Sequence, residues 1–164
     1  MLNYTNVITE EKSYSGLQMK EIKPIMKLII RGKKREFLSA IGKSLNLLLP
    51  TESNTSSRSE KLSALWLSPD EWMIYSNEVS DPNNNDYETE NLLNKNISKT
   101  NLGAVTDVTD QFVLINIKGD KIFDLFETGS PFNFNDFRYK KGSVTQTILA
   151  KIDVIIHNQN QNEV

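Results

Sequence analysis

Few side chains in this sequence have the chemistry of a nucleophile, a general base or a metal ligand. The 164 residues contain no cysteine, which excludes thiolate nucleophiles, disulfides, cysteine-ligated zinc and iron–sulfur clusters. The one histidine, His157, precedes a polar C-terminal stretch and has no evident partner for catalysis. A histidine in that setting is more typical of a surface position than of a catalytic base.

Carboxylates are the remaining candidates for acid–base chemistry. Asp107 and Asp110 fall in a Thr-Asp-Val-Thr-Asp segment, where Asp and Thr side chains commonly bond nearby backbone amides. A general base also needs a partner and a pocket, which the sequence does not show, so we interpret this segment as a turn. From the residues alone we assign no catalytic, cofactor-binding or metal-binding residue.

Charge and motif content exclude several kinds of ligand. The chain has 19 basic and 21 acidic residues, and its lysine pairs at 33–34 and 140–141 are scattered, so we expect no nucleic-acid partner. No G-x-G-x-x-G or G-x-x-x-x-G-K-[ST] motif is present to hold a phosphate. The sequence shows neither a secretory signal nor about 20 consecutive apolar residues, which predicts a cytoplasmic protein without a membrane partner.

Aromatic residues are more informative than the titratable ones. Trp66 and Trp72 lie in a predicted hairpin, where a place in the core is the simpler interpretation. Four further aromatic residues follow Pro131 within a loop-like segment: Phe132, Phe134, Phe137 and Tyr139. Because residues 132–137 are too polar for a core strand, we expect this aromatic loop to dock on a partner.

The elements that position these residues follow a pattern that occurs twice. In the first half, residues 25–30 predict a strand, residues 33–49 a helix, and residues 62–67 and 72–75 a hairpin. The helix face is formed by Phe37, Ile41, Leu45 and Leu48, and Pro50 is expected to end the helix. Residues 87–97 predict a further short helix with Asp86 as its N-cap.

In the second half, residues 112–117 predict a strand and residues 145–149 and 153–157 a hairpin. Between them, Ile122, Phe123 and Phe126 form a helical face that should end by Pro131. The two pseudo-repeats, at about residues 24–76 and 111–157, predict an α+β fold with antiparallel sheets and packed helices, unless the similarity is fortuitous. We expect one α+β domain over residues 21–157, a polar leader over 1–20 that is disordered or bound to a partner, and a frayed tail over 158–164.

Two motifs stand out in the sequence, W-L-x-P-D-E-W at residues 66–72 and T-D-V-[ST]-D-Q at residues 106–111, accompanied by segments 47–55 and 146–154. They resemble those of the gamma subunit family of heterotetrameric sarcosine oxidase. Together they are fairly specific, and the similarity extends over about residues 22–157. The family is also distantly similar to the folate-binding domain of aminomethyltransferases, but the Gly-Gly segment and acidic pair of those enzymes have no counterpart here.

The resemblance implies a small, non-catalytic subunit that supports assembly with alpha, beta and delta subunits. It implies that FAD, FMN, NAD and tetrahydrofolate are bound by those partners and none by this chain alone. The complex would convert sarcosine to glycine, hydrogen peroxide and 5,10-methylenetetrahydrofolate. The alternative is a stand-alone folate-binding or aminomethyltransferase-like protein of one-carbon metabolism, and a tryptophan fluorescence titration with tetrahydrofolate would distinguish the two.

Overall fold

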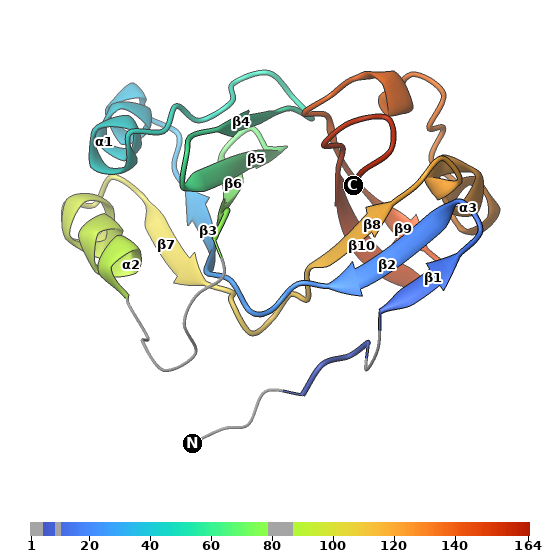
Figure 1. The fold of residues 1–164 in the computed structure, drawn as a ribbon. Helices are drawn as coiled ribbons and strands as arrows, with labels where there is room; N and C mark the ends of the chain where they lie inside the picture. The colour runs from blue at the N-terminus through green and yellow to red at the C-terminus, as the bar shows by residue number, and fades with distance from the viewer. Residues whose placement is uncertain (1–4, 9–10, 79–86) are drawn as a thin grey trace. The chain divides into compact units, whose positions relative to one another are not determined.

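The computed structural model describes residues 5–8, 11–78 and 87–164, which fold into two compact units (Figure 1). Unit 1 comprises the described residues up to Lys23 together with Val113–Val164, and unit 2 comprises those between Pro24 and Phe112. The elements of unit 1 are β1 (Lys12–Tyr14), β2 (Leu17–Glu21), β8 (Ile115–Lys118), α3 (Ile122–Gly129), a 3-10 turn (Phe137–Tyr139), β9 (Val144–Leu149) and β10 (Ile152–His157). Those of unit 2 are β3 (Lys27–Arg31), α1 (Arg35–Leu45), β4 (Ser56–Arg58), β5 (Leu62–Ser68), β6 (Glu71–Ser76), α2 (Glu88–Leu93), a π-helical turn (Asn94–Ser98) and β7 (Ala104–Asp107).

The α+β class and the antiparallel sheets predicted from the sequence are confirmed. The predicted single domain over residues 21–157 instead corresponds to two units, because the buried side chains form two separate hydrophobic clusters. The first pseudo-repeat lies in unit 2, as β3, α1 and the β5–β6 hairpin. The second, from residue 113 onward, lies in unit 1 as β8, α3 and the β9–β10 hairpin.

Unit 2 is built on a five-stranded antiparallel sheet with the strand order β4-β5-β6-β3-β7. Its central strand β6 carries Ile74, which is fully buried and lies opposite both Leu28 and Ala64. Helices α1 and α2 pack against these strands through Phe37, Ile41 and Leu93. The predicted hairpin around Pro69 is present as β5 and β6, with Ser68 opposite Glu71 across the turn.

Helix α1 confirms part of the predicted helix over residues 33–49. Phe37 and Ile41 are fully buried, but the helix ends at Leu45 because Asn46 adopts a left-handed conformation with φ of 49°. Beyond that point the helical spacing no longer applies, and Leu48 is 80% exposed. The predictions of Leu48 as a core residue and of Pro50 as the helix end are therefore wrong.

Two other local predictions differ in detail from the structure of unit 2. Residues 51–60, where the sequence predicts no helix or strand, include the edge strand β4, whose backbone pairs with β5. The short helix predicted at 87–97 is present as α2 and the π-helical turn that continues it. The proposed N-cap Asp86 lies outside the described residues, and Tyr87 occupies the N-cap position without a side-chain hydrogen bond.

Unit 1 contains a three-stranded sheet, β1-β2-β8, and the two-stranded sheet β9–β10. The β9–β10 hairpin turns at Ala150 and Lys151, which both have positive φ, as a tight two-residue hairpin turn requires. Helix α3 buries Ile122, Phe123 and Phe126, which confirms the predicted face. In unit 2 the first repeat strand β3 pairs with its own hairpin, whereas in unit 1 the corresponding strand β8 pairs with β2.

The prediction of a disordered leader is wrong for residues 12–20, whereas its alternative, a leader bound to a partner, stays a prediction. Strands β1 and β2 form a hairpin that turns at Gly16, and β2 pairs in turn with β8. The carboxylate of buried Glu21 also accepts a hydrogen bond of 2.7 Å from the backbone N–H of Ile8. Gly119 must lack a side chain, because a Cβ there would lie 2.1 Å from the carbonyl oxygen of Gly16.

The prediction of a frayed tail is also wrong, because the last residues pair with the free edge of β8. Val164 and Ile117 exchange two backbone hydrogen bonds of 2.9 and 3.0 Å. The carboxylate of Glu163 lies 3.0 Å from the ammonium of Lys118. Burial raises the pKa of Glu163, but hydrogen bonds from Lys118 and Asn116 outweigh this effect, so the pKa is lowered overall.

Buried Asn158 donates its side-chain N–H to the carbonyl oxygens of two residues in the preceding turn, Phe137 and Lys140.

Candidate functional site

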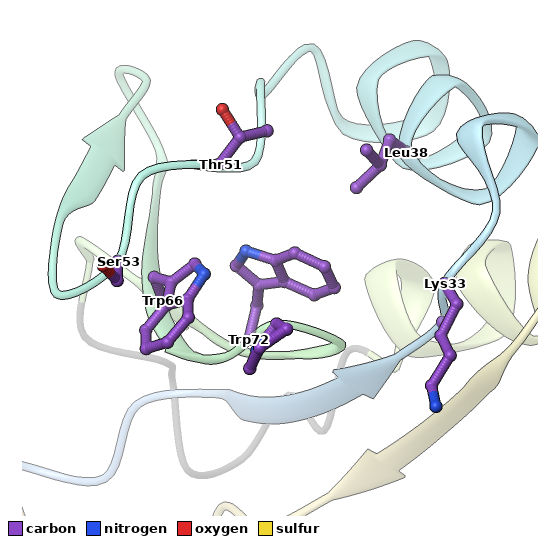
Figure 2. Close-up of a pocket in the computed structure, with 8 residues that line it drawn as sticks. Lys33, Leu38, Thr51, Ser53, Trp66 and Trp72 are labelled. Carbon is purple, nitrogen blue, oxygen red and sulfur yellow. The ribbon is translucent and has the colours of Figure 1, made fainter.

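The candidate site is a pocket of about 310 Å³ in unit 2, lined by both tryptophans of the chain. Figure 2 shows the two indoles side by side, with Ser53 on one side and Lys33 and Leu38 on the other. Gly32, Thr51 and Pro69 complete the lining. The pocket therefore brings together the β3–α1 connection, the segment before β4 and the β5–β6 turn.

Trp72 forms the fixed part of the pocket. It is 3% exposed, and its indole N–H donates a 2.8 Å hydrogen bond to the carbonyl oxygen of Pro50. Its ring lies 5.9 Å from that of Phe37, measured between ring centroids. These contacts agree with the core position expected for this tryptophan.

Trp66 lies directly opposite Trp72 in the β5–β6 register and is only partly buried. Next to Trp66, a β-bulge between Trp66 and Ser68 shifts the register between strands β5 and β6. Within the described residues its indole N–H has no hydrogen-bond partner, nor do the hydroxyls of Thr51 and Ser53. The pocket thus presents one aromatic face and three polar groups that a ligand can use.

Charged residues at the β3 end of the pocket are paired with each other. Asp70 lies 3.6 Å from the guanidinium of Arg31 and 3.8 Å from the ammonium of Lys33, and Glu71 lies 3.9 Å from Arg31. The hydrogen bond from Ser68, followed by the neighbouring cations, lowers the pKa of Asp70. Asp70 is therefore ionised near neutral pH, and the ion pairs with Asp70 and Glu71 offset the charges of Arg31 and Lys33.

Of the two carboxylates singled out from the sequence, Asp107 bonds the backbone, as expected, whereas Asp110 forms no such bond within the described residues. Asp107 accepts a 2.8 Å hydrogen bond from the N–H of Thr109, and the hydroxyl of Thr109 accepts one of 3.0 Å from the N–H of Lys27. Lys27 is buried, and its ammonium donates to the carbonyl oxygen of Ile25. Burial lowers the pKa of Lys27, although Asp110 and Asp107 oppose that shift.

The aromatic segment after Pro131 does not form a docking loop. Phe134 is fully buried and Phe137 is 6% exposed, and their rings pack with Phe123 and Phe126 in the core of unit 1. The expectation that residues 132–137 dock on a partner is therefore wrong for Phe134 and Phe137. The polar residues between the aromatic ones lie at the surface, so a compact turn buries rings that no regular periodicity indicates.

His157 lies in unit 1, where its Nδ1 is 2.8 Å from the side-chain amide nitrogen of Gln159. The described part of the chain contains no group of three or more His, Cys, Asp or Glu residues that could hold a metal ion. Sequence reasoning singled out both tryptophans but missed Lys33, Leu38 and Ser53 as parts of one pocket. Lys33 and Leu38 precede the two tryptophans by 28 or more positions and Ser53 by 13 or more, and only the fold brings them together.

Among the described residues, no helix has the length and apolar character needed to cross a membrane.

Comparison with solved structures finds the α+β fold of this chain in other proteins. Fourteen chains of solved structures match it, including one titled "Heterotetrameric Sarcosine Oxidase from Corynebacterium sp. U-96 in complex with pyrrole 2-carboxylate". That chain is 16% identical with a TM-score of 0.77, and the match covers 90% of this chain and 72% of that one. At this identity the likeness establishes the fold.

The family follows from the sequence itself. A family model described as "Sarcosine oxidase, gamma subunit family" matches residues 32–163, well over half of the chain. The protein therefore belongs to the sarcosine oxidase gamma subunit family, which confirms the resemblance seen in the two motifs. A search of curated proteins found no match.

Proposed function

We propose that this chain is the gamma subunit of a heterotetrameric sarcosine oxidase and that it supports assembly of the complex without contributing reacting groups. The observation that carries this proposal is the family match over residues 32–163, which includes both motif segments. The similarity in fold to a chain of a heterotetrameric sarcosine oxidase supports it. In this proposal the partners are the alpha, beta and delta subunits, and the complex is cytoplasmic.

The chemistry of the proposed complex would take place on its partners. In such a complex, flavin would carry two electrons from the N-methyl group of sarcosine to dioxygen, giving hydrogen peroxide. Tetrahydrofolate would accept the methyl carbon as a methylene bridge, leaving glycine. In this proposal FAD, FMN, NAD and tetrahydrofolate are held by the partner subunits.

The side chains of this chain are consistent with a supporting role. Asp107 and Thr109 fix the end of β7 to β3, and Asp70 and Glu71 pair with cations of the β3–α1 connection. Each of these polar groups stabilises the fold of unit 2 by bonding a neighbour. What the chain can offer to a partner is its exposed surface and the tryptophan pocket.

The test is to express the partner subunits with and without this chain. We expect omission of the chain to lower the yield of assembled, flavin-containing complex, measured as visible absorbance per amount of protein in the fraction of full mass. Adding the purified chain back should restore that yield. If the partners assemble and oxidise sarcosine equally well without the chain, the supporting role is refuted.

A further inference from the structure

The tryptophan pocket has features that the stability of unit 2 does not explain. Trp72 is fixed by Pro50 and Phe37, whereas the indole N–H of Trp66 has no partner within the described residues. The hydroxyls of Thr51 and Ser53 likewise have no hydrogen-bond partner within the described residues, and both residues are exposed. An aromatic face beside unused hydrogen-bond donors is typical of a surface that binds an extended peptide.

Charges next to the pocket add a second feature. Arg31 and Lys33 are paired with Asp70 and Glu71, but Lys34 and Arg35, the next two residues, are exposed and form no ion pair with a described residue. They stand at the start of α1, where the helix dipole disfavours positive charge, so they do not stabilise the helix. Glu36 is the acidic residue of that first turn and offsets only one of the two cations, so the start of α1 keeps a net positive charge.

We propose that this pocket is the docking site for an extended, acidic segment of a partner subunit, an inference that rests on the proposed function. An apolar side chain of the segment would pack on the indole of Trp66. An extended backbone has no internal hydrogen bonds, so its carbonyl oxygens can accept from the indole N–H and the two hydroxyls. A carboxylate of the segment would pair with Lys34 and Arg35, whose charge it complements.

The charge part of the proposal is tested with matched double substitutions. The variant Lys34→Glu/Arg35→Glu reverses the two unpaired cations, and the control Lys140→Glu/Lys141→Glu changes net charge equally at another exposed basic pair. Each purified chain is titrated into the partner subunits, and the dissociation constant is measured at low and at high salt. We expect the first variant to bind at least about tenfold more weakly, with a reduced salt dependence, and the control to bind within about threefold of wild type.

The aromatic part is tested at Trp66. Trp66→Ala removes the ring and the N–H, whereas Trp66→Phe keeps a smaller aromatic face and removes the donor. Tyr139→Ala is the control, because Tyr139 is an aromatic residue that is 67% exposed. We expect a loss of at least about tenfold for Trp66→Ala, a smaller loss for Trp66→Phe and no change for Tyr139→Ala, with circular dichroism used to confirm that each chain is folded.

The outcomes separate this inference from the proposed function. If wild-type chain binds the partners and the folded Trp66 and Lys34/Arg35 variants bind equally well, the docking site is refuted while the subunit role stands. If wild-type chain does not bind them, both fail. Quenching of tryptophan fluorescence in the isolated wild-type chain by micromolar tetrahydrofolate would show a small molecule in the pocket and would also overturn the docking proposal.

Discussion

Replacement of Phe134 by alanine tests the organisation of unit 1 most sharply. The side chain is fully buried, and its ring centroid lies between 4.9 and 5.9 Å from those of Phe123, Phe126, Phe132 and Phe137. Truncation of a buried phenylalanine costs about 3–5 kcal/mol, and ring pairs contribute about 0.5–1.5 kcal/mol beyond their buried area. With four neighbouring rings we expect a loss of about 4–5 kcal/mol in the free energy of unfolding.

The assay is urea unfolding followed by far-ultraviolet circular dichroism. Tryptophan fluorescence is less suitable, because both tryptophans lie in unit 2 and Phe134 lies in unit 1. With a urea slope of about 2 kcal/mol per molar, the expected loss lowers the unfolding midpoint by about 2 M. Tyr139→Ala, at an exposed position of the same segment, should change the free energy by less than about 0.5 kcal/mol. A Phe134→Ala midpoint within about 0.5 M of wild type would refute the buried aromatic cluster.

The remaining predictions concern glycine sites and two titrating groups. Gly42→Ala in α1 should stabilise the chain by about 0.5–1 kcal/mol, because the added Cβ meets nothing closer than 3.8 Å. Gly103→Ala should destabilise it by about 1–3 kcal/mol, because its Cβ would lie 2.2 Å from a backbone oxygen of β3. Thermal unfolding of both variants tests this, and equal melting temperatures would contradict it. Burial lowers the pKa of Lys27, so the unfolded chain binds its proton more tightly, and the free energy of unfolding of wild type should rise relative to that of Lys27→Met as pH rises from about 8 towards 10. Urea unfolding at several pH values measures this difference, and a difference that does not change with pH would contradict the prediction. The pKa of Glu163 is lowered in the folded chain, so the stability that its ionised form contributes is present above the pKa of the unfolded chain and lost as pH falls through the pKa of the folded one. In acid unfolding, wild type should therefore lose up to about 1 kcal/mol more stability than Glu163→Gln, and identical acid profiles would count against the paired tail.

Short sequence patterns predicted the helices and hairpins, which are formed by residues close together along the chain. The face of α3 follows helical spacing, and the hairpin around Pro69 combines apolar runs with residues suited to a turn. The hairpin around Ala150 is indicated by its two apolar runs alone, because Ala150 and Lys151 are not typical of a turn with positive φ. These features fix secondary structure because each depends on a few adjacent residues. They also placed Trp66 and Trp72 in one hairpin, and the structure shows that the two lie opposite each other and line the pocket.

The elements that were missed depend on backbone pairing between distant segments. Strand β2 pairs with β8, and Val164 pairs with Ile117 through N–H and carbonyl groups that every sequence supplies, so the polar side chains there gave no sign of it. The rings of Phe134 and Phe137 are buried from an irregular turn, which leaves no helical or strand period to detect. Likewise, the distant parts of the pocket converge only in the folded chain.

The most direct test of the proposed subunit role is the native mass of whatever co-purifies with this chain. The chain would be tagged and expressed together with the alpha, beta and delta candidates from the same source, and the purified material would be measured for mass and visible absorbance. The proposal predicts a yellow complex with the mass of one copy of each of four subunits. Recovery of this chain alone as a colourless monomer, with the other three subunits assembled separately, would contradict it.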